Sequence, residues 1–213
     1  MDQHLEWAKQ LKVERTIKNL KKNNIEGFYA KDKSEALDIV KSLINEGDTV
    51  SVGGSMTLFE MGLIDFLREG NYQFLDRYKE GLNRDELQDI YRKTFSANAF
   101  FASVNAITEE GTLYNIDGTG NRVAAMIYGP DKVIILAGIN KIVKDETEAM
   151  NRARDIAAPT NAHRLSRKTP CVVTGCCMDC ESPERICANY VMIKRQMNPE
   201  RMKVILIDNT YGY

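Results

Sequence analysis

The sequence has no long apolar run. None of its 213 residues falls in a segment approaching the roughly 20 apolar residues that a membrane-spanning helix needs. Residues 1–24 are charged throughout and lack the apolar segment of a secretory signal peptide. These absences lead us to expect a cytoplasmic protein with no membrane-spanning helix.

The sequence also has no excess of charge of either sign. Lys and Arg together number 29 and Asp and Glu 30, so the formal net charge is -1. Composition therefore gives no electrostatic reason to expect binding to nucleic acid or to a membrane surface. We expect the partner to be a small molecule or another protein. A homodimer is expected only because such oligomers are common.

Histidine is scarce, with two residues in the chain. We expect His4 on the exposed side of an N-terminal helix. His163 lies in the basic stretch HRLSRK, which is typical of a charged surface. Neither histidine is therefore a leading candidate for catalysis or for metal binding.

What the sequence does contain is the pattern of an α/β protein. With 43% hydrophobic residues, the chain can bury the core of one domain spanning residues 1–213. Apolar residues at helical spacing predict an amphipathic helix over 1–23 that packs on this domain. Strands are predicted at 25–30, 48–54, 71–76, 131–138, 170–175 and 203–208, with two more and a hairpin turn within 99–117. Helices are predicted at 34–47, 55–70, 83–98, 121–129, 145–168 (broken at Pro159) and 183–197.

This alternation predicts the fold class. Strands with continuous apolar runs, separated by helices, favour a three-layer α/β/α sandwich around a mainly parallel, Rossmann-like sheet. The strands within 99–117 add a β-hairpin insertion.

A glycine pair ends the strand predicted at 48–54. Gly53 and Gly54 permit a tight turn and a close approach of backbone amides to an anion, while Ser55 adds a hydroxyl at the start of a helix. The segment is neither a Walker sequence nor a full GxGxxG. Anion binding and a simple strand-to-helix turn are equal alternatives on this pattern.

A second glycine-rich loop is denser in polar groups than a turn requires. Its members are Asn115, Asp117, Gly118, Thr119, Gly120 and Asn121. Such a loop can present amides and carboxamides to a carboxylate or phosphate, although Asn and Asp in turns also bond to their own backbone. We favour binding, because ligands of open α/β sheets lie at the carboxyl ends of strands, where both loops are predicted.

Three other charged residues are candidates for the site. Lys141 follows the strand at 131–138 and is expected either to neutralise an anionic ligand or to serve the structure. Glu109 and Glu110, in the predicted hairpin turn, can supply a carboxylate for acid/base or covalent catalysis, although acidic turn residues are usually only solvated.

Four of the five cysteines lie close together, as Cys176, Cys177, Cys180 and Cys187. An odd number is a poor framework for structural disulfides. The pattern leaves open a zinc or iron–sulfur site, a redox pair at Cys177 and Cys180, and packed thiols. The adjacent Cys176 and Cys177 cannot easily both ligate one ion, and no second CxxC pair follows. Cys171 is expected in the core of the strand at 170–175.

Three segments carry a resemblance to a known family. Residues 52–62 (VGGSMTLFEMG), 100–145 (FFASVNAITEEG through INKIVKD) and 176–187 (CCMDCESPERIC) resemble the LUD-domain family of lactate-utilization proteins. That family resembles the superfamily of ribose-5-phosphate isomerase, glucosamine-6-phosphate deaminase and the CoA transferases, so a CoA transferase-like fold is implied.

The resemblance also implies site residues and partners. It places a phosphate or carboxylate loop on Gly53, Gly54 and Ser55. It places a polar loop on Asn105, Glu110, Asn115, Gly118 and Thr119. It implies a role in oxidising L-lactate with iron–sulfur partner proteins, although the chain lacks the C-x2-C-x2-C-x3-C-P run of bacterial ferredoxins.

Three functions follow from these observations. The leading hypothesis is a lactate-utilization protein that binds a small anionic ligand and assists oxidation of L-lactate or a similar 2-hydroxy acid. The first alternative is an isomerase or transferase that acts on a sugar phosphate or an acyl-CoA. The second is a non-catalytic regulatory module that binds a metal or has a redox role.

Overall fold

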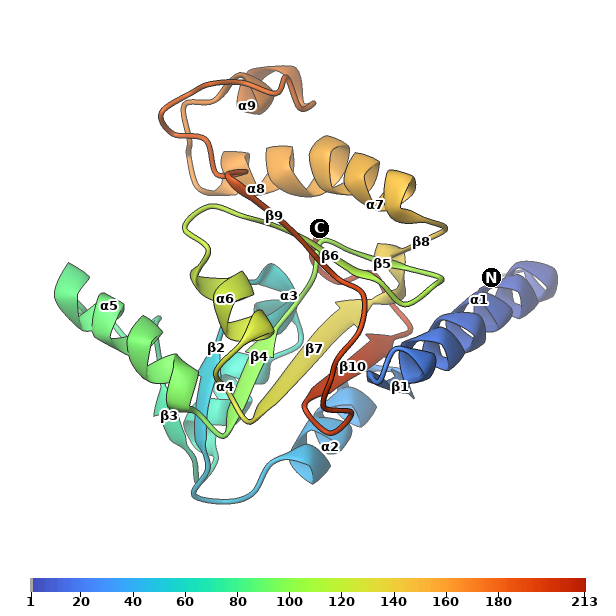
Figure 1. Cartoon of the computed structure of the whole chain (residues 1–213), viewed down its shortest axis with the longest axis horizontal. Helices are drawn as coiled ribbons and strands as arrows, with labels where there is room; N and C mark the ends of the chain where they lie inside the picture. The colour runs from blue at the N-terminus through green and yellow to red at the C-terminus, as the bar shows by residue number, and fades with distance from the viewer. Residues whose placement is uncertain (1) are drawn as a thin grey trace.

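The computed structural model describes residues 2–213, and its strands form two sheets (Figure 1). The central sheet is wholly parallel, in the order β1 (Glu26–Ala30), β10 (Met202–Ile207), β7 (Lys132–Gly138), β4 (Ala99–Ala102), β2 (Thr49–Val52) and β3 (Gln73–Leu75). The second sheet has the order β8 (Ile142–Val143), β5 (Ala106–Thr108), β6 (Leu113–Asp117) and β9 (Asn189–Ile193).

Helices cover both faces of the central sheet. Alternate residues of β7 enter different cores, with Val133 and Ile135 on one face and Ile134 and Leu136 on the other. This is the period of two expected for a strand buried on both sides. The first face packs against α1 (Gln3–Lys22) and α6 (Asn121–Ile127), and the second against α2 (Lys33–Leu43), α3 (Met56–Glu60) and α4 (Leu63–Glu69). The predicted three-layer α/β/α fold class is confirmed.

The hairpin predicted within 99–117 is present, with one difference. β5 and β6 pair antiparallel, and Gly111 in the turn between them has φ +84°, a conformation that favours glycine. The preceding residues form a separate strand, β4, in the central sheet. The segment therefore contributes three strands rather than two.

The helix predicted at 55–70 is divided. α3 ends at Glu60 and α4 begins at Leu63. Gly62 between them has φ +72°, in the left-handed region. Such a residue ends one helix and redirects the chain into the next.

The helix predicted at 145–168 is not broken by Pro159. α7 (Glu146–Arg152) continues through a π-helical turn, η3 (Ala153–Ala157), into α8 (Ala158–Arg164). Pro159 lies in the first turn of α8. Proline lacks the backbone N–H that continues the helical hydrogen-bond ladder, and Pro159 closely follows the turn where that ladder changes from α to π. These helices cover the second sheet, and Ala149 and Ala153 pack against Tyr114 and Ile116 of β6.

Two predictions near the C-terminus are wrong. Residues 170–175 form a short helix, α9 (Pro170–Thr174), instead of a strand. Proline suits the first helical position, and Gly175 closes the helix at φ +74°. Residues 183–197 form a turn and the strand β9 instead of a helix, because residues 189–193 pair with β6.

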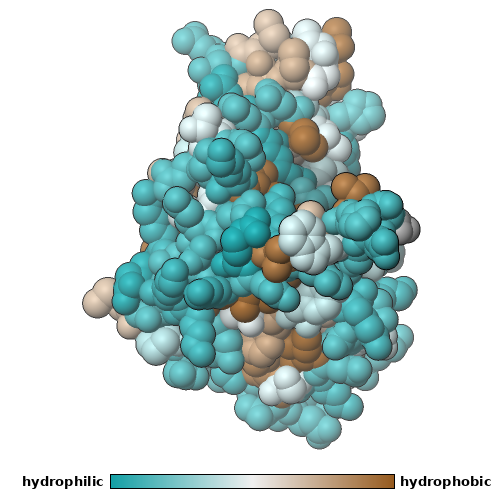
Figure 2. Space-filling model, turned by 90° about the vertical axis from the view of Figure 1, so that its right-hand side faces the viewer, coloured by the Kyte–Doolittle hydropathy of each residue, from teal (hydrophilic) through white to brown (hydrophobic). Residues whose placement is uncertain are grey.

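The face shown in Figure 2 is mostly hydrophilic, with hydrophobic residues in separate groups. Scattered apolar residues of this kind are normal on protein surfaces. Within residues 2–213, no helix combines the length and the apolar character required to cross a bilayer.

Candidate functional site

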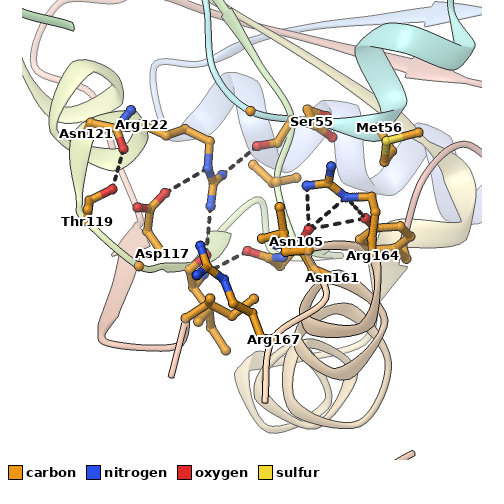
Figure 3. Close-up of a pocket in the computed structure, with 18 of the residues that line it drawn as sticks. Ser55, Met56, Asn105, Asp117, Thr119, Asn121, Arg122, Asn161, Arg164 and Arg167 are labelled. Carbon is orange, nitrogen blue, oxygen red and sulfur yellow. Dashed lines mark hydrogen bonds and ion pairs between the residues drawn. The ribbon is translucent and has the colours of Figure 1, made fainter. Parts of the chain in front are cut away.

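A cavity of about 480 Å³ lies at the carboxyl ends of β2, β4 and β7. After β2 the chain continues to β3 on one side of the sheet, whereas after β4 it continues towards β7 on the other. Such a reversal leaves a crevice at the strand ends, where ligands of open α/β sheets bind. The 117–121 loop, α8 and the segment 183–186 form the other walls (Figure 3).

The cavity lining is strongly cationic. Among the residues that the structure describes, its basic members are Arg77, Arg122, Lys141, Arg164, Arg167 and Arg185. The carboxylates in the lining are Asp117 and Glu184. The positive charge comes from these side chains rather than from helix dipoles, since α3 and α6 have only 5 and 7 residues. We call this space the anion cavity.

Arg122 is the fixed cation of the anion cavity. Its guanidinium donates to the carbonyl of Ser103 at 2.8 Å, to Asn115 Oδ1 at 2.8 Å and to Asp117 Oδ2 at 3.1 Å. Burial lowers the pKa of Arg122, while the Asp117 carboxylate opposes this shift. Because arginine stays protonated in proteins, Arg122 forms an ion pair with Asp117 at the base of the cavity, and the surrounding acceptors hold its guanidinium in place.

Lys141 is the second buried cation. Its ammonium donates to Thr57 Oγ1 at 3.0 Å, to Ser103 Oγ at 3.0 Å and to the carbonyl of Val104 at 3.1 Å. Burial, together with the charges of Arg152 and Arg122, lowers the pKa of Lys141 to about 7. Lys141 can therefore gain or lose a proton near neutral pH.

Arg77 reaches the cavity from the loop after β3. It donates to the hydroxyl of Tyr91 at 2.8 Å, and its guanidinium lies 4.8 Å from the centre of the Tyr91 ring. A Cβ on Gly54 would lie 3.6 Å from Arg77 Nη1. The glycine therefore leaves the backbone open beside a guanidinium held by an aromatic ring.

α8 and the segment after it supply the opposite wall. Arg164 donates to Asn161 Oδ1 at 2.8 Å and to the hydroxyl of Tyr213 at 2.6 Å. Figure 3 shows Arg164 and Arg167 across the cavity from Ser55 and Met56. Both arginines are exposed, so they are accessible to a ligand that enters from solvent.

Residues 13–207 match the LUD domain. The chain belongs to the LUD-domain family. No curated protein sequence matches it significantly.

This LUD domain has the fold of a solved structure from the same family. A DUF162 family protein from Deinococcus radiodurans matches with a TM-score of 0.51 and 12% identity, over 93% of this chain and 98% of the other. The malonate decarboxylase alpha subunit from Acinetobacter baumannii gives a TM-score of 0.41 and 13% identity, over 97% of this chain and 38% of that one. eIF2B beta from Chaetomium thermophilum gives a TM-score of 0.38 and 17% identity, over 55% of this chain and 45% of that one.

The LUD domain brings most of the predicted ligand-binding residues to one place. Those that line the anion cavity are Gly54, Ser55, Asn105, Gly118, Thr119, Asn121 and Lys141. Gly53 and Asn115 lie behind this surface, both buried against Arg122. Gly120 has φ +84°, and its N–H donates to Asp117 Oδ1 at 2.8 Å, so it shapes the loop.

The two glutamates proposed as catalytic are placed elsewhere. Glu109 pairs with Arg15 of α1 at 2.7 Å, and Glu110 is exposed in the hairpin turn. Neither side chain lines the anion cavity. Their position gives no geometric support to an acid/base or covalent role on a ligand bound there.

The cysteines are arranged differently from the predicted set. Cys171, Cys177, Cys180 and Cys187 line a second cavity of about 20 Å³, whereas Cys176 is exposed. Cys171 lies on α9 and not in a buried strand, and Cys187 precedes β9 and is not helical. Within residues 2–213, no three His, Cys, Asp or Glu side chains are grouped so that they could hold a metal ion. The zinc or iron–sulfur ligand set, one of the three alternatives that the sequence left open, is therefore not assembled among these residues.

Sequence reasoning missed the arginines of the anion cavity. Arg164 and Arg167 fall in the basic stretch that we interpreted as a charged surface, Arg185 falls in the cysteine-rich segment 176–187, and Arg77 belongs to no motif. The basic stretch HRLSRK was the one sequence signal for these arginines. It could be assigned to the anion cavity only once the structure placed α8 beside the strand ends.

Proposed function

We propose that this LUD domain binds a small anionic metabolite, bearing a carboxylate or a phosphate, in the anion cavity. The observation that carries the proposal is the lining, where six Arg and Lys side chains accompany two carboxylates. The whole chain has a net charge of -1, so this excess is local. A concave surface with charge of one sign raises the local concentration of the opposite ion.

The leading ligand class is L-lactate or a similar 2-hydroxy acid, as the resemblance to lactate-utilization proteins implies. Arginine can hold a carboxylate through two parallel hydrogen bonds, and Arg164 and Arg167 are the exposed candidates. Lys141 is the cavity group suited to move a proton near neutral pH. Oxidation of the hydroxy acid releases two electrons, which this proposal assigns to iron–sulfur partner proteins.

A sugar phosphate or an acyl-CoA is the second ligand class, and the size of the cavity favours it. Pockets of roughly 300–1,000 Å³ accommodate drug-sized ligands. The anion cavity, at about 480 Å³, lies in this range and exceeds what a three-carbon acid needs. The position of Glu109 and Glu110 offers no support for a glutamate-dependent isomerase or transferase.

Calorimetric titration tests the proposal, with L-lactate, pyruvate, ribose 5-phosphate and coenzyme A as probes. We expect at least one probe to bind and Gly54→Asp to weaken its binding more than about tenfold, because like charges at close range cost several kcal/mol. The added carboxylate would lie beside Arg77 and repel the ligand. A Cβ there makes only ordinary contacts, so the fold should persist, which circular dichroism checks.

Two arginine variants provide the matched comparison. Arg164→Ala removes a charge from the cavity wall, whereas Arg92→Ala removes one from the exposed surface of α5 (Arg84–Lys93). We expect only the first to weaken binding. Equal affinities for wild type, Gly54→Asp and Arg164→Ala, or no binding of any probe, would contradict the proposal. The preferred probe distinguishes a hydroxy acid from a phosphorylated ligand.

A further inference from the structure

The small cysteine-lined cavity brings together thiols that are separated in the sequence. Cys171 comes from α9, Cys177 and Cys180 from the loop after Gly175, and Cys187 from the segment before β9. All four are partly buried. The space between them, about 20 Å³, is close to the roughly 10–15 Å³ that one water molecule requires. We call it the thiol cavity.

Cys177 differs from the other thiols in its partners. Arg154, which extends from the π-helical turn η3, reaches the loop between Cys177 and Cys180, where its Nη2 lies 3.9 Å from Asp179 Oδ2. The backbone N–H of Asp179 donates to Cys177 Sγ at 3.5 Å. The φ of Asp179, +46°, is left-handed, so the loop takes an uncommon conformation at this residue. As a general rule, an N–H that donates to a sulfur and a cation in the same loop favour the thiolate, which is the nucleophilic form of cysteine.

The surroundings of Arg154 also contain an opposing charge. The Asp179 carboxylate lies 3.9 Å from Arg154 Nη2 and accepts from Arg185 Nη2 at 3.1 Å. Arg185 therefore shares the neutralisation of Asp179. Cys177, and to a smaller extent Asp179, raise the pKa of Arg154, so the guanidinium remains a cation beside this loop.

Arg185 also holds the second cysteine of the CxxC pair. It donates to the carbonyl of Cys180 at 2.6 Å and to the carbonyl of Cys187 at 2.9 Å. Cys177 and Cys180 thus lie on the same small cavity in a loop fixed from both sides. In a reduced protein, this spacing is typical of thiol–disulfide chemistry.

We propose that Cys177 and Cys180 form a thiol–disulfide exchange site, with Cys177 as the attacking thiolate and Cys180 as the resolving thiol. The oxidant class is a low-molecular-weight disulfide. The Cys177 thiolate attacks one sulfur of this disulfide, forming a mixed disulfide and releasing one thiolate. Cys180 loses its proton and attacks the Cys177 sulfur, which releases the second thiolate. The two protein thiols supply the two electrons that reduce the small disulfide to two thiols.

The arrangement favours this chemistry over a metal site. A tetrahedral ion needs three or four ligands at fixed distances, and no such group is assembled in the part of the chain that the structure describes. Exchange requires only two thiols that can meet. The proposal is independent of the ligand in the anion cavity, although Arg185 and Ile186 line both cavities.

The test uses the full-length protein, purified and reduced without oxygen, with oxidised glutathione as the probe. Zinc and iron are quantified first. Free thiols are then counted by alkylation and mass spectrometry, and the linked cysteines are mapped in peptides. We expect the five thiols to fall by two, through an intramolecular link between Cys177 and Cys180. A link at other cysteines, or no loss of thiols, would overturn the proposal.

Variants separate the roles of the residues. Cys180→Ser should stop at the mixed disulfide on Cys177, and Cys176→Ser, which changes an exposed neighbour, should react as the wild type. Arg154→Met should slow formation of the mixed disulfide by about twofold or more, because it removes a cation from the CxxC loop. Arg84→Met, which changes an exposed arginine on α5, should leave this rate unchanged. Arg154→Met leaves all five cysteines intact, so its rate tests the proposal even if a cysteine variant misfolds. If the wild type holds stoichiometric zinc or iron and Cys177→Ser releases it, the exchange proposal is overturned and the cysteines form a metal site.

Discussion

Gly53 and Gly54 are adjacent in the sequence but have different surroundings. A Cβ on Gly53 would lie 2.9 Å from Arg122 Cγ and 3.2 Å from the Phe100 ring. At Gly54 the nearest atom would be Arg77 Nη1, at 3.6 Å. Arg122 is buried and bonded on several sides, so it cannot easily move away from Gly53. The glycine at 53 is required for packing, and the glycine at 54 for access to the cavity.

This difference predicts unequal losses of stability for two alanine variants. We expect Gly53→Ala to lower the free energy of unfolding by about 1–3 kcal/mol, the usual cost of overpacking a core. Gly54→Ala should change it by less than about 0.5 kcal/mol, as at most surface positions. Urea titration followed by circular dichroism measures both values. Equal stabilities of the two variants would show that Arg122 is free to move.

At the scale of elements, α5 depends on its caps. None of its residues is buried, and in Figure 1 it extends away from the central sheet. Asn83 Oδ1 accepts from the N–H groups of Asp85 and Glu86, while Glu86 Oε2 accepts from the N–H of Asn83. This capping box, which the sequence predicts, compensates for the lack of apolar contacts.

Asn83→Ala should therefore destabilise α5 locally. The loss of an N-cap costs about 0.5–2 kcal/mol, which corresponds to an increase of several-fold or more in amide exchange across the helix. Hydrogen exchange of Asp85 to Tyr91 measures the effect. Because α5 contributes nothing to the buried core, exchange in β7 should not change. Faster exchange in β7 would mean that α5 unfolds only together with the whole domain.

Elements near the C-terminus show where local patterns mislead. In residues 170–175, the pair Val172 and Val173 suggested a buried strand, yet Val173 is 89% exposed in α9. Pro170 and Gly175 were the better signals, because they suit the start and end of a helix. In β9, Tyr190 and Met192 are exposed, whereas Val191 and Ile193 pack against the core. Pairing with β6 places this segment, and its alternating burial is that of a strand covered on one face.

At the scale of the whole molecule, the anion cavity imposes a cost on folding. The pKa of Lys141 falls from 10.5 to about 7 because the folded protein buries its charge. Between these two values the unfolded chain binds more protons than the folded one. The contribution of Lys141 to the free energy of unfolding therefore becomes more favourable as pH increases from about 7 towards 10.5. Well below pH 7 this contribution is constant.

Comparison with Lys141→Met isolates this dependence. Between pH 7 and pH 9, we expect wild type to gain about 2 kcal/mol of stability relative to the variant. Chemical denaturation at both pH values measures the difference. Lys33→Met, which changes an exposed lysine on α2, should follow the wild type. A constant difference between wild type and Lys141→Met would mean that Lys141 keeps its charge in the folded state across this range.

The sequence by itself determined the layered fold and the edge where the cavity lies. Continuous apolar strands such as β7 and β10 indicate a parallel sheet, since only strands covered on both faces are apolar throughout. Parallel strands end at one edge, so Gly54, Asn105 and Lys141 could be grouped before any contact was known. These inferences depend on residues near one another in the chain.

Only the tertiary structure decided which charges and thiols meet. Arg164 joins Gly54 in the lining of the anion cavity, and Arg154 meets Asp179 between Cys177 and Cys180, through packing of α8 and η3 over distant segments. Glu109 is directed to Arg15 by the docking of α1. Local periodicity and capping encode none of these contacts, because each depends on the relative placement of elements that are buried by long-range apolar packing.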